Sequence, residues 1–285
     1  MSARELAARL GLRRARATEW RGDCPACGYA GSLILSLGSE GKALWWCASC
    51  RDKEALTAAL RGDGYAIAPA PRDRVPGPSS GQREAWARAL WARGVPIAGT
   101  AAEAYLRSRG LGTVASDALR FLPAERHTDS GHVGPVMLAA ACDVAGTIRA
   151  VHRTWLCEDG TGKANVDPPR KTLGPPAGCA VRLMPAGDAV AVAEGLETAL
   201  SAAVLFDIPA WSCLTAGGLE AVQLPASIRT VLIAADNDMS GTGQRAADAL
   251  AQRLLAEGRA VRVAIPDRPG EDFNDVLRRR TAHHG

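Results

Sequence analysis

The sequence of 285 residues has no long apolar run, and its longest ones fall far short of the roughly 20 residues that a membrane-spanning helix needs. Its first residues, Met1 to Glu5, lack the apolar core of a secretory signal peptide. A Gly-x-x-x-x-Gly-Lys-Ser/Thr loop is also missing, because residues 160–163 are the nearest approach and fail the pattern. These absences predict a soluble, cytoplasmic protein with no membrane partner and no nucleotide-driven motor in this sequence.

The eight cysteines do not follow a disulfide pattern, since four of them form two Cys-x-x-Cys pairs and the others are scattered singly. The two pairs are nineteen residues apart, and neither precedes a strand-helix-strand pattern, which disfavours a redox role. Paired thiols at this separation are typical of a structural zinc site with four thiolate ligands. The predicted ligands are Cys24, Cys27, Cys47 and Cys50.

The segment between the two pairs predicts a β-hairpin, with strands at 33–37 and 43–46 and a turn at 38–41. Such a zinc ribbon is too small to stay folded without its metal. Trp45 and Trp46 are adjacent, so they cannot both face inward on one strand. The exposed one could stack on bases or pack against the following helix.

Charge is distributed unevenly along the chain. Residues 1–182 hold 25 Lys and Arg against 17 Asp and Glu, and residues 183–285 hold 9 against 13. A basic part joined to an acidic part suits an enzyme that handles phosphates, although chance asymmetry of a solvated surface predicts the same counts. The predicted organisation is a zinc-ribbon domain with an N-terminal helix (1–65), a Pro/Gly/Ser-rich linker (66–82), a helical and basic β subdomain (83–185) and an α/β domain (186–285).

Two apolar runs in the last domain end abruptly in acidic residues. Residues 189–193 are followed by Glu194, and residues 231–235 are followed by Asp236 and Asp238. Unbroken apolar runs are typical of strands buried in a parallel sheet, whose carboxyl ends form ligand sites. Carboxylates gathered there repel one another, and Mg²⁺ or Mn²⁺ would remove that repulsion. The alternative is a pair of ordinary acidic turns and helix starts.

These strand ends, in this order, resemble the Toprim domain of topoisomerases, primases and related nucleases, over roughly residues 186–278. The resemblance implies a parallel sheet with helices on both faces. It also implies that Asp236 and Asp238 hold magnesium, with Glu194 as a further ligand or general base. Asp272 resembles a third acidic position of phage primases, although it could equally start the last helix. Glu197 is expected to have a supporting structural role.

The region before this domain predicts a hairpin of strands 135–142 and 147–156 followed by further basic residues. It resembles the N-terminal half of a primase catalytic core. The resemblance implies that its basic residues line a groove for nucleic acid or nucleotides, and solvated surface charge is the alternative. The residues are Arg149, Arg153, Lys163, Arg170 and Lys171.

The order of zinc ribbon, linker, basic region and Toprim-like domain predicts a DNA primase. Such an enzyme makes short RNA primers on single-stranded DNA from ribonucleoside triphosphates, by nucleotidyl transfer with two metal ions. Because the sequence has no motor motif, a separate replicative helicase is the expected partner. The alternatives are a Toprim-type nuclease and a catalytically silent module that binds single-stranded DNA or a helicase.

Overall fold

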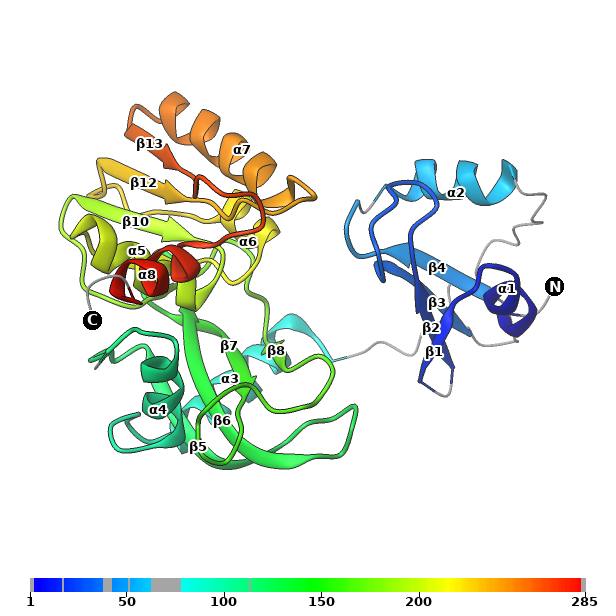
Figure 1. Cartoon of the computed structure of the whole chain (residues 1–285), viewed down its shortest axis with the longest axis horizontal. Coiled ribbons are helices and arrows are strands. Elements are labelled where there is room, and N and C mark those ends of the chain that lie inside the picture. The colour runs from blue at the N-terminus through cyan, green and yellow to red at the C-terminus, as the bar shows by residue number, and fades with distance from the viewer. Residues whose placement is uncertain are drawn as a thin grey trace. The chain divides into compact units, whose positions relative to one another are not determined.

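The structure is a computed structural model that describes residues 3–16, 18–37, 43–50, 52–62, 78–112 and 114–282. The chain divides into two compact units, residues 1–77 and 78–285, which are described one at a time (Figure 1). The predicted hairpin turn at 38–41 and residues 66–77 of the predicted linker lie outside the described residues. None of the helices in the described part is long and apolar enough to cross a membrane.

The first unit is a four-stranded antiparallel sheet with two helices. The strands lie in sequence order: β1 (Arg13–Arg16), β2 (Glu19–Gly22), β3 (Leu33–Leu37) and β4 (Ala43–Cys47). The helices are α1 (Ala3–Arg9) and α2 (Lys53–Gly62). The predicted hairpin is confirmed as β3 and β4. Strands β1 and β2 were not predicted, because β1 is exposed along its whole length and shows no alternation of apolar residues.

One face of this sheet carries the core of the first unit. Trp20, Leu35 and Trp45 lie opposite one another on neighbouring strands and pack with residues of both helices. On the other face Trp46 is 51% exposed. One tryptophan of the pair therefore faces inward and the other outward, as the alternation of strand side chains requires.

The second unit is built on one nine-stranded sheet. Eight strands run in the order β13-β12-β10-β11-β9-β6-β7-β8, and β5 pairs with β6. They are β5 (Leu119–Arg126), β6 (Val133–Cys142), β7 (Ile148–Trp155), β8 (Arg170–Leu173), β9 (Ala180–Arg182), β10 (Ala189–Ala193), β11 (Ala210–Ser212), β12 (Thr230–Ala234) and β13 (Ala260–Ala264). The basic β region and the parallel strands thus share a sheet, because β9 pairs with β6 on one side and β11 on the other.

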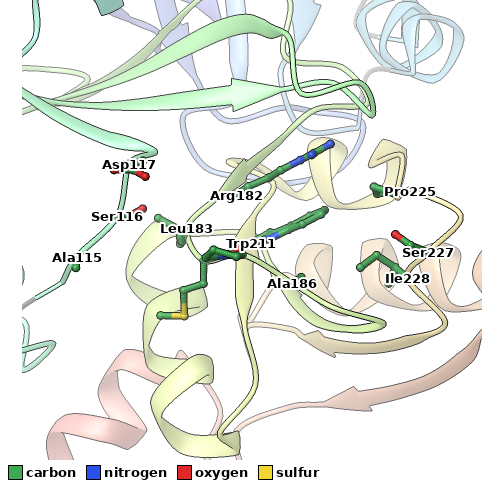
Figure 2. A pocket seen from close by; sticks show the side chains of 12 residues that line it. Ala115, Ser116, Asp117, Arg182, Leu183, Ala186, Trp211, Pro225, Ser227 and Ile228 are labelled. Atoms are coloured by element: carbon green, nitrogen blue, oxygen red, sulfur yellow. Dashed lines mark hydrogen bonds between the residues drawn. The ribbon is translucent and has the colours of Figure 1, made fainter.

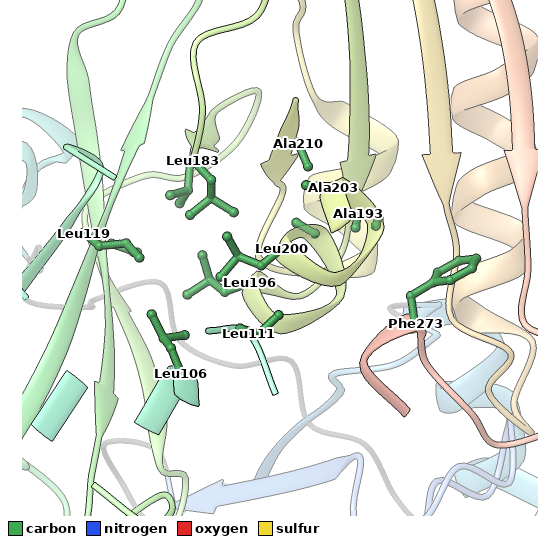
Figure 3. Packing of buried hydrophobic residues seen from close by; sticks show 14 of the residues in the cluster. Leu106, Leu111, Leu119, Leu183, Ala193, Leu196, Leu200, Ala203, Ala210 and Phe273 are labelled. Carbon is green, nitrogen blue, oxygen red and sulfur yellow. The ribbon is translucent and has the colours of Figure 1, made fainter. Parts of the chain in front are cut away.

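Helices cover both faces of this sheet. Helices α4 (Ala101–Ser108), α5 (Leu196–Phe206) and α8 (Phe273–Ala282) share one core with the strands, and Figure 3 shows Leu196 and Leu200 of α5 packed within it. Helices α6 (Ala216–Ala221) and α7 (Thr242–Ala256) cover the parallel strands on the opposite face, and α3 (Ser80–Arg93) covers β6 and β7 there. The predicted parallel sheet with helices on both faces is confirmed.

Helix α3 begins inside the segment predicted as linker. The Ser79 hydroxyl accepts a hydrogen bond from the Gln82 amide, and the Gln82 side chain accepts one from the Ser79 amide. This reciprocal cap satisfies two amides that a helix start leaves unpaired. Residues 80–82 are therefore helical rather than linker, because Ser79 stops the Pro-rich segment with a strong helix-start signal.

Candidate metal sites

The four predicted zinc ligands come together in the first unit. The thiols of Cys24, Cys27, Cys47 and Cys50 all lie within 4.8 Å of one another, and the sulfurs of Cys27 and Cys47 are 3.7 Å apart. Tetrahedral sulfurs at a Zn–S distance of about 2.3 Å lie about 3.8 Å from one another. The cluster therefore has the dimensions of a four-thiolate zinc site.

Local hydrogen bonds favour the thiolate form at Cys47. Burial raises the pKa of this thiol, but the Ser32 hydroxyl at 3.2 Å and the backbone amides of Ser49 and Cys50 lower it to about 6. Gly28 follows the first Cys-x-x-Cys pair with φ of +70°, a conformation that glycine adopts without a steric penalty. The loops that carry the two Cys-x-x-Cys pairs therefore favour thiolate ligands for a cation.

The predicted acidic centre lies at the carboxyl ends of two adjacent parallel strands. Glu194 directly follows β10, and Asp236 follows β12 after one more residue. Burial raises the pKa of Asp236 to about 7, and the charges of Glu194 and Asp272 add to the effect. The pKa of Glu194 is also raised, first by burial and then by the charge of Asp238. The structure therefore brings the four predicted carboxylates close enough to repel one another.

Asp238 differs from the other carboxylates because it is tied to the start of α7. Its Oδ2 accepts a hydrogen bond from the Gly243 amide at 2.8 Å, and its Oδ1 accepts from the amide and hydroxyl of Ser240 and from the Thr242 amide. Burial raises the pKa of Asp238, but these hydrogen bonds outweigh it and hold the pKa below its usual value. A Cβ on Gly243 would lie 3.0 Å from Oδ2 of Asp238, so only glycine allows this approach without rearrangement.

Asp272 caps the start of α8 and also acts electrostatically on the acidic centre. Its Oδ1 accepts a hydrogen bond from the Asp275 amide at 2.9 Å, which caps the start of α8. Its charge also raises the pKa of Asp236, and burial raises its own pKa. The helix-start role is thus a contact of the structure, and binding of a metal by Asp272 stays a prediction.

The carboxylates of the acidic centre are more widely spaced than the four thiols. Among the described residues, only the four thiols bring three or more ligand atoms within 4.8 Å of one another. Mg²⁺ usually takes one or two protein carboxylates and completes its shell with water and substrate phosphates. Buried carboxylates that raise one another's pKa are chemically suited to such an ion, and magnesium binding here stays a prediction.

The structure divides the five predicted basic residues between the two faces of the β7–β8 hairpin. Arg149 forms a 2.7 Å ion pair with Glu84 of α3, Arg153 is buried over the ring of Trp155, and Lys171 forms a 2.7 Å ion pair with Asp129. All three lie on the face that α3 covers, with their charges matched to nearby acids or buried.

Lys163 and Arg170 lie on the side of the acidic centre. The Lys163 ammonium is 3.3 Å from Glu197, and Arg170 projects from β8 on the face opposite Lys171. The charge of Arg170 lowers the pKa of both Glu194 and Glu197. Two of the five predicted cations therefore act electrostatically on the region around Glu194.

Two further cations line a pocket that the sequence did not reveal. The pocket has a volume of about 220 Å³, and its lining includes Arg109, Lys163 and Arg278 with the hydroxyl-bearing Ser108 and Thr161. We call it the cationic pocket. The charge of Arg109 also lowers the pKa of Asp272, so this cation acts electrostatically on the acidic centre. Arg109 is four residues after Tyr105 on the same helical face, which is the one sequence signal that could have linked it to this region.

A second pocket, of about 680 Å³, lies at the other end of the parallel strands (Figure 2). It is lined by residues 183–186 and 225–228, which precede β10 and β12. There the Arg182 guanidinium stacks on Trp211 at 4.8 Å and donates hydrogen bonds to the carbonyl oxygens of Asp143 and Val144. The acidic residues follow these strands, so this pocket is separate from the acidic centre.

Comparisons with solved structures return bacterial and phage primases. A primase of Aquifex aeolicus with zinc-binding and RNA polymerase domains is 14% identical over 100% of this chain and 81% of that chain, with a TM-score of 0.44. The primase fragment of the bacteriophage T7 primase-helicase is 19% identical over 94% and 96%, with a TM-score of 0.39. A primase domain from Pseudomonas aeruginosa is 17% identical over 71% and 77%, with a TM-score of 0.43. A search of curated protein sequences returned no match.

Two family models match adjacent parts of the chain. Residues 81–183 match a domain of unknown function, and residues 189–283 match the Toprim domain. The second match covers the parallel strands β10 to β13 together with all four acidic residues of the centre. The predicted family of this region is therefore confirmed, and residues 189–283 of the chain are a Toprim domain.

Proposed function

We propose that this protein is a DNA primase that joins ribonucleotides into short primers on single-stranded DNA. The observation that carries the proposal is the convergence of Glu194, Asp236, Asp238 and Asp272 at one edge of the Toprim sheet, where burial and mutual repulsion raise the pKa of Asp236 to about 7. A Toprim domain with this many interacting carboxylates is suited to phosphoryl chemistry with divalent cations.

Each part of the centre has a separate task in this proposal. Asp236 and Glu194 would hold Mg²⁺ or Mn²⁺, which would lower the pKa of the attacking 3′-hydroxyl and neutralise charge on the phosphate. Asp238 stays ionised through its hydrogen bonds to the start of α7, and it fixes the loop that carries Asp236. A raised pKa also suits Glu194 to accept a proton.

The cationic pocket is the proposed site for nucleotide phosphates. Arg109, Lys163 and Arg278 supply positive charge there, and the buried Nε of Arg109 has no hydrogen-bond partner among the described residues. A buried donor without a partner costs about 1–3 kcal/mol unless water or a ligand satisfies it. Phosphate oxygens would provide the missing acceptors. Arg170 would extend this positive charge toward the template or primer.

The first unit would bind structural zinc and contact the template. Its four thiols fit Zn²⁺, and the exposed ring of Trp46 offers a surface on which a base could stack. A helicase, which would separate the strands ahead of priming, is the proposed partner.

A primer assay tests this function. Purified protein is incubated with single-stranded DNA, labelled ribonucleotides and Mg²⁺ or Mn²⁺, and the products are separated on a gel. We expect short RNA products from the wild type and none from Asp236→Asn. Asp248→Asn, which changes an exposed carboxylate of α7, is the matched control and should stay active.

The alternatives give different products in the same assay. Shortened DNA without RNA synthesis would indicate a Toprim nuclease, which uses similar carboxylates. Binding of DNA with neither product would indicate a silent module and would overturn the proposed activity.

A further inference from the structure

A buried ionic cluster lies one helical turn beyond Glu194. Glu197 is in the first turn of α5 and is only 6% exposed. Its Oε1 accepts a hydrogen bond from the Tyr105 hydroxyl and lies 3.3 Å from the Lys163 ammonium. The three side chains come from α5, α4 and the loop between β7 and β8. Glu197 thus connects three segments that are far apart in the sequence.

Glu197 is held in its charged form despite its burial. Burial raises the pKa of its carboxyl, but the Lys163 charge and the Tyr105 hydrogen bond lower it to about 2. The neighbouring His152 does not compete for this charge, because burial and the charge of Arg170 lower its pKa to about 4. A buried ion pair is seldom better for stability than apolar side chains of the same volume. Fold stability alone is therefore a poor explanation for a charge at this position.

The backbone of Lys163 is held beside the sheet. Lys163 lies in the loop between β7 and β8 and forms an isolated bridge with Leu156, and the next amide, of Ala164, donates a hydrogen bond to the Trp155 carbonyl oxygen. The same loop packs tightly on α4, where a Cβ on Gly160 would lie 2.5 Å from the Ala101 carbonyl oxygen. The Lys163 side chain is 30% exposed and lines the cationic pocket. Its ammonium can therefore contact Glu197 and still face a ligand in the pocket.

We propose that Glu197 is a positioning residue, which fixes the Lys163 ammonium relative to the acidic centre. Helix α5 begins two residues after Glu194, so a lysine held by Glu197 keeps a constant relation to the carboxylate at the end of β10. Without the ion pair, the Lys163 side chain would sample many rotamers, and in most of them the ammonium would not contact the reacting phosphate. The proposal rests on the proposed function in one respect, namely that the cationic pocket receives nucleotide phosphates.

Removing the charge of Glu197 should change binding and turnover in opposite directions, so that phosphate binding tightens while kcat falls. Glu197→Gln keeps the size of the side chain and an acceptor for Tyr105, but it releases Lys163 and removes a negative charge near the cationic pocket. Binding of a flexible polyanion should therefore tighten, by about fivefold, while a contact needed only in the transition state is lost. We expect kcat for primer synthesis to fall by about tenfold with no rise in KM for ribonucleotides.

The experiment is a double-mutant cycle of Glu197→Gln and Lys163→Met. Affinity for inorganic tripolyphosphate is measured by calorimetry without metal, and kcat and KM are measured by primer synthesis. If Glu197 acts through Lys163, Glu197→Gln lowers kcat no further in the Lys163→Met background, and it tightens tripolyphosphate binding less there than in the wild type. Effects of Glu197→Gln that are equal in both backgrounds would overturn the proposal. A Glu197→Gln protein whose kcat and affinity match the wild type, after correction for the fraction of folded molecules, would also overturn it.

Glu158→Gln, which removes the charge of an exposed carboxylate in the same loop, is the matched control. It keeps the ion pair between Lys163 and Glu197, so it should leave both constants within about twofold. If the wild type makes no primer, the proposed function fails. The tripolyphosphate cycle still tests the link between Glu197 and Lys163 in that case.

Discussion

The thiol cluster and the acidic centre offer a cation two different sets of ligands, which differ in spacing and in completeness. The four thiols lie within 4.8 Å of one another and provide a complete tetrahedral set from two short loops. The carboxylates of the acidic centre are spread over a wider space, and burial raises the pKa of Asp236 and Glu194. A closed site keeps its ion for structure, whereas an open site leaves room for substrate atoms. Under the proposed function, the first site stabilises its unit and the second carries out the chemistry.

Loss of the thiol cluster should have the largest effect. A structural zinc ion in a small domain contributes about 10–16 kcal/mol of folding free energy at neutral pH. Cys47→Ser should therefore unfold the first unit and leave the second unit folded, since the two are separately compact. Circular dichroism and limited proteolysis of the full chain, with zinc content measured by mass spectrometry, check this. Zinc-free wild-type protein with a folded first unit would contradict the assignment.

Asp236→Asn should do the reverse, removing activity while stabilising the metal-free protein. The raised pKa of Asp236 means that the folded state binds a proton more tightly than the unfolded state. Stability from this group is present below about pH 4 and is lost as the pH rises through about 7. The substitution should remove this loss, on the order of a few kcal/mol at pH 8. Urea unfolding from pH 4 to pH 8 in chelator measures it, and equal pH slopes for both proteins would exclude the mechanism.

Asp238→Asn should lower the stability of the protein, whereas the same substitution at Asp236 should raise it. Asp238 accepts hydrogen bonds from Ser240, Thr242 and Gly243, so its charge supports the start of α7. Loss of a charge-assisted cap costs about 0.5–2 kcal/mol. Melting curves at pH 7 should therefore place this variant below the wild type. A variant as stable as the wild type would mean that the hydrogen bonds contribute nothing net.

The smallest expected effect is a difference in DNA binding between variants on the two faces of the β7–β8 hairpin. Arg170→Ala should weaken binding of single-stranded DNA and reduce the slope of log affinity against log salt by about 0.7. Arg149→Ala should leave both the affinity and the slope unchanged, because Arg149 is already paired with Glu84 of α3. Fluorescence anisotropy at several salt concentrations measures the slopes. Equal slopes for the two variants would mean that nucleic acid does not distinguish these faces.

The sequence was sufficient for the elements whose local signals are strong. Apolar runs ending in acid predicted β10, β12 and the acidic centre, and the two Cys-x-x-Cys pairs predicted the thiol cluster. The alternation of side chains along a strand also places Arg149 and Arg153 on one face of β7. It could not predict which face α3 covers, because that depends on packing between segments more than fifty residues apart.

Other features depend on tertiary contacts that have no local pattern. Arg109 and Arg278 meet at the cationic pocket from α4 and α8, and neither helix has a motif that indicates it. The sheet continues from the basic region into the Toprim strands through β9, which is only three residues long. The hydrogen bonds of Asp238 arise because Gly243 allows α7 to start against its carboxylate. These contacts form between segments that are far apart in the sequence, so they could be identified only from the folded structure.

The most direct test of the contrast between the two sites is the effect of Mg²⁺ on the melting temperature of the second unit. We expect Mg²⁺ to raise the melting temperature of the wild type at pH 8, because the ion relieves repulsion between Asp236 and Glu194. We also expect Asp236→Asn to melt at a higher temperature than the wild type without Mg²⁺ and to gain little from the ion. A wild type that does not respond to Mg²⁺, or a variant that responds equally, would contradict the account.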